Sequence, residues 1–142
     1  MTAVQLDDMP TAERMLRRLI AVNPDAAHAY NALGYSLAER GLRLGEAQSL
    51  IEKALQLSPS DGYIQDSLGW VQYKQGNLDA ARKTLTAAYA RQPDAEIAAH
   101  LGEVLWQLGE HDAARATWKK GQRLAPNNKA LQETMQRLDP AR

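Results

Sequence analysis

Apolar residues recur at helical spacing in short segments, and each segment is followed within two residues by glycine or proline. In the segment 8–22, Leu16 is three residues from Leu19 and four from Ile20, which is typical of one helix face. This segment ends at Asn23-Pro24, because the residue before a proline disfavours the α-helical region. We therefore predict an all-α protein of about eight helices with no β-sheet. The further helices are expected near residues 26–40, 45–57, 61–75, 78–91, 95–108, 111–124 and 127–138.

The segments themselves repeat with a period of about 34 residues. A Leu-Gly pair occurs three times, and its glycines Gly34, Gly69 and Gly102 are 35 and then 33 residues apart. Units that recur in phase in this way indicate helix pairs stacked into a solenoid with a continuous core. Two further kinds of residue recur with the same period: prolines at Pro24, Pro59, Pro93 and Pro126, and small residues at Ala47, Ala81 and Ala114 and at Ala54, Ala88 and Gly121.

This spacing of Leu-Gly, alanine and proline resembles the tetratricopeptide repeat over nearly the whole chain. The resemblance implies a right-handed α-solenoid of antiparallel helix pairs. We expect residues 1–7 to be frayed and residues 139–142 to be disordered. The expected units are the second helix of a truncated repeat (1–24), three whole repeats (25–59, 60–93 and 94–126) and a capping helix with its tail (127–142).

Residue size predicts how the helices of a pair pack. Gly69 has no side chain where the first helix meets the second, and we expect Ala81 to face it, so that the two backbones approach closely. Glycines at the helix junctions, such as Gly76 and Gly109, are expected to take the left-handed conformation. The turn inside the first whole repeat, residues 41–45, is one residue longer than the turn inside the second.

Composition excludes several functional classes. Seventeen basic residues balance 17 acidic ones, and no block of like charge indicates a nucleic-acid partner. No apolar run approaches the roughly 20 residues that span a bilayer, so we expect no direct membrane insertion of this segment. The chain has no cysteine, no phosphate-binding loop and no nucleophile elbow. We therefore expect neither an enzyme nor a cofactor.

The resemblance implies that the first helices line a concave groove that holds a segment of a partner protein. Trp70, Tyr73 and Trp106 are expected to stand uncovered there as anchors; the alternative is that they pack between adjacent first helices. Trp118, on a second helix, is expected in the core. The predicted groove residues are Asn31, Tyr35, Tyr63, Asp66, Ser67, Trp70, Tyr73, Lys74, His100, Glu103 and Trp106.

Two special chemistries of this groove are disfavoured. The two-carboxylate clamp of chaperone-binding family members needs cations at places that here hold Asn31, Glu96 and His100, so a carboxylate terminus is not the expected ligand. Glu96, His100 and Glu103 share one helix face and could hold a metal, but such spacing is common on solvated faces, and we expect no metal site. Acidic residues in the groove favour an apolar or basic partner segment.

The segments around Leu33-Gly34, Leu68-Gly69 and Leu101-Gly102 also resemble the C-terminal end of longer proteobacterial tetratricopeptide repeat proteins. Some members of that group are lipid-anchored at the outer membrane, and members have been linked to a periplasmic protease that processes C-termini. The resemblance implies a scaffold or adaptor, a periplasmic protease as a candidate partner, and a periplasmic location on an outer-membrane-anchored parent. A cytoplasmic location is the alternative.

A second hypothesis concerns the first predicted helix. Its repeat partner is absent from the sequence, so we expect the chain to be the C-terminal part of a longer protein. Met15, Leu16 and Leu19 would then leave an apolar face partly uncovered. Under this architectural alternative the chain acts as a spacer within a larger protein or causes that protein to self-associate. A homodimer would form through the apolar face.

Overall fold

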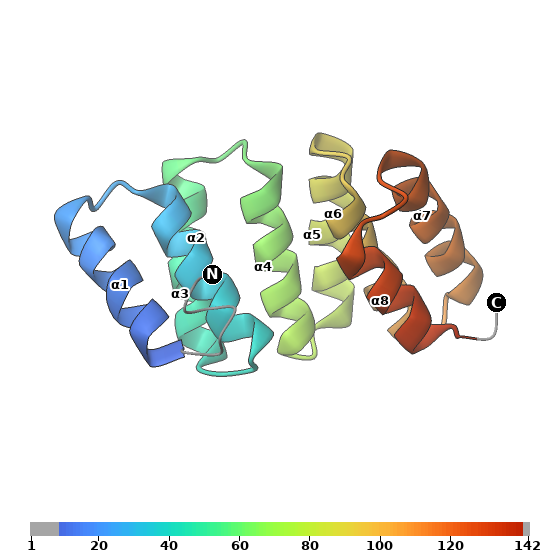
Figure 1. The fold of residues 1–142 in the computed structure, drawn as a ribbon, viewed down its shortest axis with the longest axis horizontal. Helices are drawn as coiled ribbons and strands as arrows, with labels where there is room; N and C mark the ends of the chain where they lie inside the picture. The colour runs from blue at the N-terminus through green and yellow to red at the C-terminus, as the bar shows by residue number, and fades with distance from the viewer. Residues whose placement is uncertain (1–8, 141–142) are drawn as a thin grey trace.

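The computed structural model describes residues 9–140 and shows eight helices and no strand within that range (Figure 1). Every helix boundary lies within two residues of the position predicted from the sequence. The helices are α1 (Met9–Val22), α2 (Ala27–Glu39), α3 (Leu44–Leu57), α4 (Gly62–Lys74), α5 (Leu78–Arg91), α6 (Ala95–Gln107), α7 (His111–Leu124) and α8 (Lys129–Leu138).

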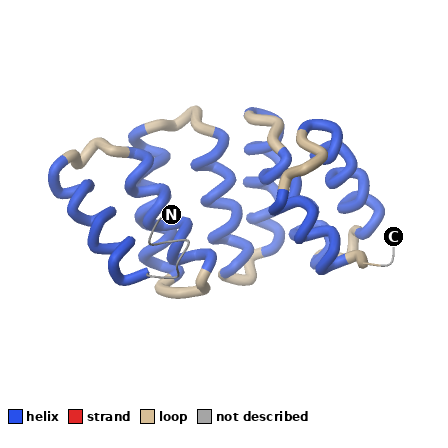
Figure 2. The backbone as a smooth tube through the Cα atoms, viewed as in Figure 1, coloured by secondary structure: helices blue, strands red, loops and turns tan. Residues whose placement is uncertain are grey.

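The helices form a single curved row of pairs, α2 with α3, α4 with α5 and α6 with α7, flanked by α1 and α8 (Figure 2). The first helices touch one another: α4 packs against both α2 and α6, and α8 packs against α6. No Cα atoms within 8 Å join α3 to α5 or α5 to α7. Because the first helices are closer together than the second helices, α2, α4, α6 and α8 line the concave side of the solenoid.

The turns inside the pairs follow the glycine prediction. Gly76 and Gly109 each have a φ of 85°, and Gly41 has a φ of 67°, a region that glycine enters without steric cost. The turn from α2 to α3 has four residues and the other two have three. The extra residue is accommodated at Arg43, which takes a left-handed φ of 45° directly before α3.

The close approach within a pair involves the glycine and a second-helix residue one turn after the predicted alanine. A Cβ on Gly69 would lie 2.6 Å from Leu85 Cγ, and a Cβ on Gly102 would overlap the indole of Trp118. In the first repeat, a Cβ on Gly34 would lie 2.9 Å from the carbonyl oxygen of Ala47, so the predicted alanine faces the glycine there and Ile51 adds to the contact. Ala81, the equivalent alanine in the second repeat, is fully buried.

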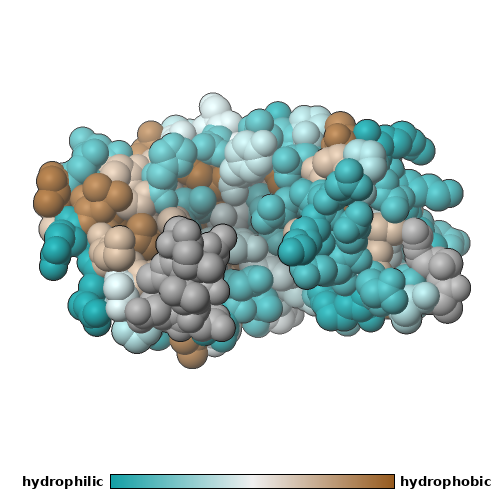
Figure 3. Space-filling view, viewed as in Figure 1, coloured by the Kyte–Doolittle hydropathy of each residue, from teal (hydrophilic) through white to brown (hydrophobic). Residues whose placement is uncertain are grey.

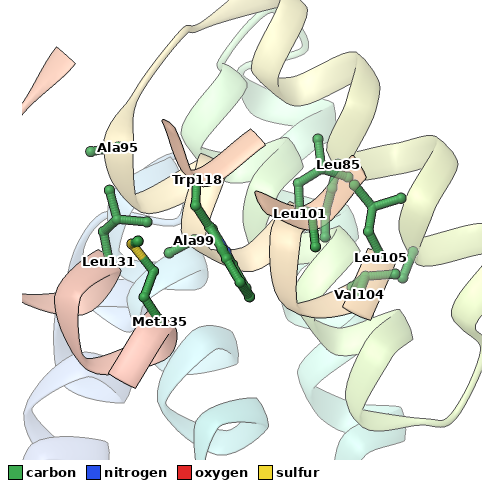
Figure 4. Close-up of a cluster of buried hydrophobic side chains, with 11 residues drawn as sticks. Leu85, Ala95, Ala99, Leu101, Val104, Leu105, Trp118, Leu131 and Met135 are labelled. Carbon is green, nitrogen blue, oxygen red and sulfur yellow. The ribbon is translucent and has the colours of Figure 1, made fainter. Parts of the chain in front are cut away.

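The C-terminal core is built around Trp118 (Figure 4). This side chain is fully buried, as predicted, and Leu131 and Met135 of α8 lie on one side of it. Removing two apolar side chains of α8 from water stabilises its position at the end of the array. A helix lies within the predicted range 127–138, and its role as a cap stays a prediction.

The residue after α8 corrects an expectation about the tail. Asp139 is only 8% exposed and accepts a hydrogen bond of 2.8 Å from Arg115 Nε of α7. The ion pair joins the end of the chain to the last repeat, so the expected disorder is wrong at Asp139. Residues 1–7 and 141–142, for which fraying and disorder were also predicted, lie outside the described range.

Candidate functional site

The predicted groove residues all lie on the inner helices α2, α4 and α6, where the structure separates them into three groups. The first is a buried polar cluster, the second lines an open depression, and the third belongs to neither. The cluster comprises Tyr35, Asp66, Trp70, Tyr73, His100 and Glu103; Asn31, Tyr63 and Ser67 line the depression together with Tyr35 and Asp66; the third group is Trp106 and the exposed Lys74, whose ammonium lies at the edge of the cluster.

His100 is the centre of the buried cluster. Its Nδ1 is 2.8 Å from Oδ1 of Asp66 on α4, and its Nε2 is 3.4 Å from the hydroxyl of Tyr35 on α2. Burial opposes protonation of the imidazole, but the carboxylates of Asp66, Glu96 and Glu39 outweigh it, so the pKa of His100 is raised. This cluster links three successive repeats through residues far apart in sequence.

Trp70 is part of the same cluster and is only 5% exposed. Its ring stacks on His100 and on Tyr73, with centroid separations of 4.1 and 4.8 Å, and its Nε1 donates a 2.8 Å hydrogen bond to Glu39. The ammonium of Lys74 lies 5.2 Å from the ring centroid. The expectation that Trp70 stands uncovered is therefore wrong, and the alternative describes it: the ring packs between adjacent first helices.

Trp106 is covered by its own repeat, contrary to the expectation. Its ring stacks on His111 with 3.8 Å between centroids and on Trp118 with 5.7 Å, while the guanidinium of Arg115 lies 5.4 Å away. All three neighbours belong to α7. The side chain is thus turned toward the second helix and is not among the residues that line either groove depression.

The C-terminal helix supplies a cation to the groove that sequence reasoning missed. Arg137 of α8 donates a 2.7 Å hydrogen bond from Nη2 to Oε1 of Glu103, and the hydroxyl of Tyr73 donates a 2.8 Å bond to Oε2. No residue of α8 was among the predicted groove residues. The position of α8 in the sequence could have predicted this contact. Each first helix follows a closing proline, and α8 follows Pro126 in the same way, so its side chains reach the same concave surface.

Two open depressions adjoin along this surface. The first, of about 260 Å³, lies between α2, α4 and the start of α6, and the second, of about 330 Å³, lies along α6 between α8 and residues of α2 and α4. Tyr35 and Glu96 line both, so the two form one trough, which we call the concave trough. Six carboxylates line it (Glu39, Asp66, Asp94, Glu96, Glu103 and Glu133), against the two basic residues His100 and Arg137.

Glu96 occupies the junction of the two depressions, near the start of α6. The helix begins there because Asp94 accepts hydrogen bonds from the backbone N–H groups of Glu96 and Ile97. Partial burial, together with the carboxylates of Asp66, Asp94 and Glu39, raises the pKa of Glu96 against a smaller opposing effect of His100. Burial is thus the main reason that the pKa of Glu96 is raised, and the neighbouring carboxylates add to it.

Two of the three side chains considered for a metal, those of His100 and Glu103, are engaged with protein groups. His100 Nδ1 is held by Asp66, and both oxygens of Glu103 are held by Tyr73 and Arg137. In residues 9–140 no group of three or more histidine, aspartate or glutamate side chains is arranged to hold a metal ion. Within the same range, no helix combines the length and apolar character needed to cross a membrane.

A curved row of antiparallel helix pairs with a polar inner face defines a helical-repeat protein. The tetratricopeptide repeat family model matches residues 1–62 and 67–129, and the chain belongs to this family. Apart from residues 63–66 of α4, the matched residues cover the three helix pairs and reach the start of α8.

Relatives of known sequence are considerably longer than this chain. It is 52% identical over 103 residues to the TPR repeat-containing protein PA4667 of Pseudomonas aeruginosa, a match that covers 72% of the chain and 18% of that protein. It is 29% identical over 133 residues to the protein O-mannosyl-transferase TMTC1 of Mus musculus, covering 90% of the chain and 14% of that protein. The chain thus spans less than a fifth of the length of either relative.

Solved structures share the fold. The thermophilic TPR protein TTC0263 of Thermus thermophilus superposes with a TM-score of 0.82 at 25% identity, over 92% of this chain and 73% of that one. MamA from Desulfovibrio magneticus RS-1 superposes with a TM-score of 0.72 at 18% identity, over 89% and 72% of the two chains. At the latter identity the likeness concerns the fold alone.

Proposed function

We propose that this chain is a non-catalytic scaffold that holds a segment of a partner protein in its concave trough. The observation that carries the proposal is the trough itself, an open polar and aromatic channel that runs across α2, α4, α6 and α8. Concave surfaces of repeat solenoids are extended binding surfaces, because every repeat contributes a first helix to one continuous face.

Because of the burial seen in the structure, we propose tyrosines in place of the tryptophans as the residues that contact the partner. Tyr63 is 48% exposed and Tyr35 lines both depressions, whereas Trp70 and Trp106 are packed within the protein. An exposed tyrosine offers a large apolar body with a polar tip, which suits a protein contact. We therefore assign first contact with the partner to the Tyr35–Tyr63 depression.

The buried cluster supports a structural role over catalysis. It contains His100 and Asp66 and lies near Ser67, residue types that also occur in hydrolytic triads. Here the hydroxyl of Ser67 donates to the carbonyl oxygen of Tyr63 on its own helix, and His100 is held between Asp66 and Tyr35. This arrangement cross-links the inner helices and presents no activated nucleophile to the trough.

A selection from a phage library of random dodecapeptides tests the function. Peptides enriched on the intact chain should lose binding to the Tyr63→Ala variant. They should keep binding to Leu124→Ala, which truncates a residue of similar exposure, 50%, on the outer helix α7. The proposal fails if no peptide is enriched, or if enriched peptides bind both variants equally well.

A second candidate function, self-association, is favoured by the exposed side of α1. Met15, Leu19 and Val22 are 63%, 47% and 78% exposed and follow one another at helical spacing; Figure 3 shows hydrophobic residues gathered at this end of the molecule. Leu16, predicted as part of this face, is half-buried, and Val22 was missed. An apolar stripe can pack on its own copy about a two-fold axis.

Analytical ultracentrifugation tests the self-association. The intact chain should dimerise at high concentration, and Leu19→Ser combined with Val22→Ser should remain monomeric. Leu42→Ser is the matched control, since Leu42 is also 47% exposed but lies in the turn between α2 and α3. A strict monomer at high concentration would contradict this second candidate.

For location and partner identity we retain the proposals drawn from resemblance. These are a periplasmic position on an outer-membrane-anchored parent and a periplasmic protease as partner. Fractionation of cells that express the natural protein would decide between the periplasm and the cytoplasm. Recovery in the cytoplasmic fraction would remove the protease as a candidate partner.

A further inference from the structure

The concave trough already holds one guanidinium group, contributed by the chain itself. Arg137 reaches from α8 to Glu103, which is only 6% exposed, and donates to both of its carboxylate oxygens at 2.7 and 3.4 Å. A tyrosine hydroxyl, from Tyr73, completes the carboxylate's hydrogen bonds. This contact shows the chemistry by which the inner helices hold a cationic side chain: a carboxylate of α6 beside a tyrosine of a neighbouring first helix.

The Tyr35–Tyr63 depression presents the same groups without a cation. No lysine or arginine of the described residues lines it, although Asp66, Asp94 and Glu96 do. Asp66 is held by His100 and Asp94 caps α6, so Glu96 is the carboxylate left for a ligand. No hydrogen bond to the side chain of Glu96 is formed by any described residue.

A second feature of the depression also calls for a hydrogen-bond donor. The side-chain oxygen of Asn31 is buried, and no described residue donates to it. A buried acceptor without a partner is costly, because it has lost its bonds to water and gained none in return. A ligand with several N–H donors would satisfy the carboxylate of Glu96 directly, and would satisfy this oxygen once the Asn31 side chain turns toward the depression.

We propose that the Tyr35–Tyr63 depression binds an arginine or lysine side chain, so that the partner recognised by the concave trough is a basic segment. This inference rests on the proposed scaffold function and specifies its partner. Six carboxylates against two basic residues give the trough a potential that attracts cations and repels acidic segments. Arginine suits the site best, because its planar guanidinium presents five donors and stacks on aromatic rings.

The experiment uses dodecapeptides recovered from the random phage library. Each arginine in a bound peptide is replaced by citrulline, which keeps the shape of the side chain and removes its charge, and affinity is measured by fluorescence anisotropy. The same peptides are measured against Glu96→Gln and against Glu52→Gln. Glu52 is an exposed glutamate on the outer helix α3, so its variant carries the same change of charge outside the trough.

The inference expects enriched peptides to contain arginine or lysine, and it expects one citrulline replacement to weaken binding about tenfold. Glu96→Gln should weaken the arginine peptide to a similar extent and leave the citrulline peptide unchanged, while Glu52→Gln should change neither. Peptides that need Tyr63 but bind equally with citrulline, or equally to Glu96→Gln, would overturn the inference and leave the scaffold function standing. Failure to enrich any peptide would overturn both.

Amide chemical shifts give an independent reading of the same site. N-acetylarginine amide, titrated into the intact chain, should shift the backbone signals of Asn31, Tyr63 and Glu96, and N-acetylcitrulline amide should not. Equal shifts with both compounds, or shifts confined to residues outside the depression, would contradict a cation site.

Discussion

The indole ring of Trp70 stacks on the imidazole of His100, with 4.1 Å between the ring centroids and 25° between the ring planes. The two residues come from different repeats, α4 and α6, and each is less than a tenth exposed. An aromatic contact of this kind within a buried cluster stabilises the packing of one first helix on the next. Trp70 is therefore part of the scaffold.

Replacing Trp70 by alanine should destabilise the protein. Loss of a buried indole typically costs about 3–5 kcal/mol in the free energy of unfolding, because the transfer free energy is lost and a cavity remains. Urea denaturation followed by circular dichroism measures this change. Tyr63→Ala, at an exposed position, should stay within about 0.5 kcal/mol of the original protein. Equal stability of the two variants would show that Trp70 is not a packing residue.

Two glycines that look alike in sequence should respond in opposite ways to alanine. A methyl group on Gly102 would overlap the rigid indole of Trp118, so Gly102→Ala should lower the unfolding free energy by roughly 1–3 kcal/mol. Gly45 lies in the first turn of α3 with nothing within 4 Å of its Cβ position, so Gly45→Ala should raise it by about 0.5–1 kcal/mol. Thermal unfolding of both variants tests the pair, and a neutral Gly102→Ala would contradict the tight contact with Trp118.

The stability of the protein should depend on pH through His100. Its pKa is raised in the folded state, since the carboxylates of Asp66, Glu96 and Glu39 outweigh the effect of burial, while Tyr35 faces its other ring nitrogen. The imidazolium therefore contributes stability that is fully present below the unfolded pKa of about 6.5. That contribution is lost as the pH rises through the raised folded pKa.

Urea denaturation at a series of pH values above about 6 measures this loss. The decline in unfolding free energy should be flatter in His100→Gln than in the original protein, whatever the overall stability of the variant. His28→Gln, at an exposed position on α2, should keep the original slope. Identical slopes in all three proteins would show that His100 does not gain a proton-linked interaction on folding.

Binding of an arginine peptide should weaken as the solution becomes more acidic. The pKa of Glu96 is raised in the free protein by partial burial and by neighbouring carboxylates, and a bound guanidinium would lower it again. Because the complex favours the ionised carboxylate, affinity should fall as the pH drops through the raised pKa of the free state. Anisotropy titrations below about pH 6 check this, and Glu96→Gln should remove most of the pH dependence.

Much of the fold follows from spacings that the chain repeats. The Leu-Gly pairs and closing prolines predict each helix to within two residues, because backbone conformation at glycine and proline depends on local sterics. The fully buried place of Trp118 was also predictable, since large apolar residues on second helices face the pair interface. These features depend on residues within a single repeat.

The candidate site depends instead on contacts between repeats. Trp70 is covered by Glu39 and His100, which are 31 and 30 residues away, and no rule within one repeat states which way its ring turns. Arg137 enters the trough because α8 packs on α6. Sequence spacing thus assigned residues to the concave side. Whether a side chain there is buried between helices or exposed to a partner depends on how successive helices stack in space.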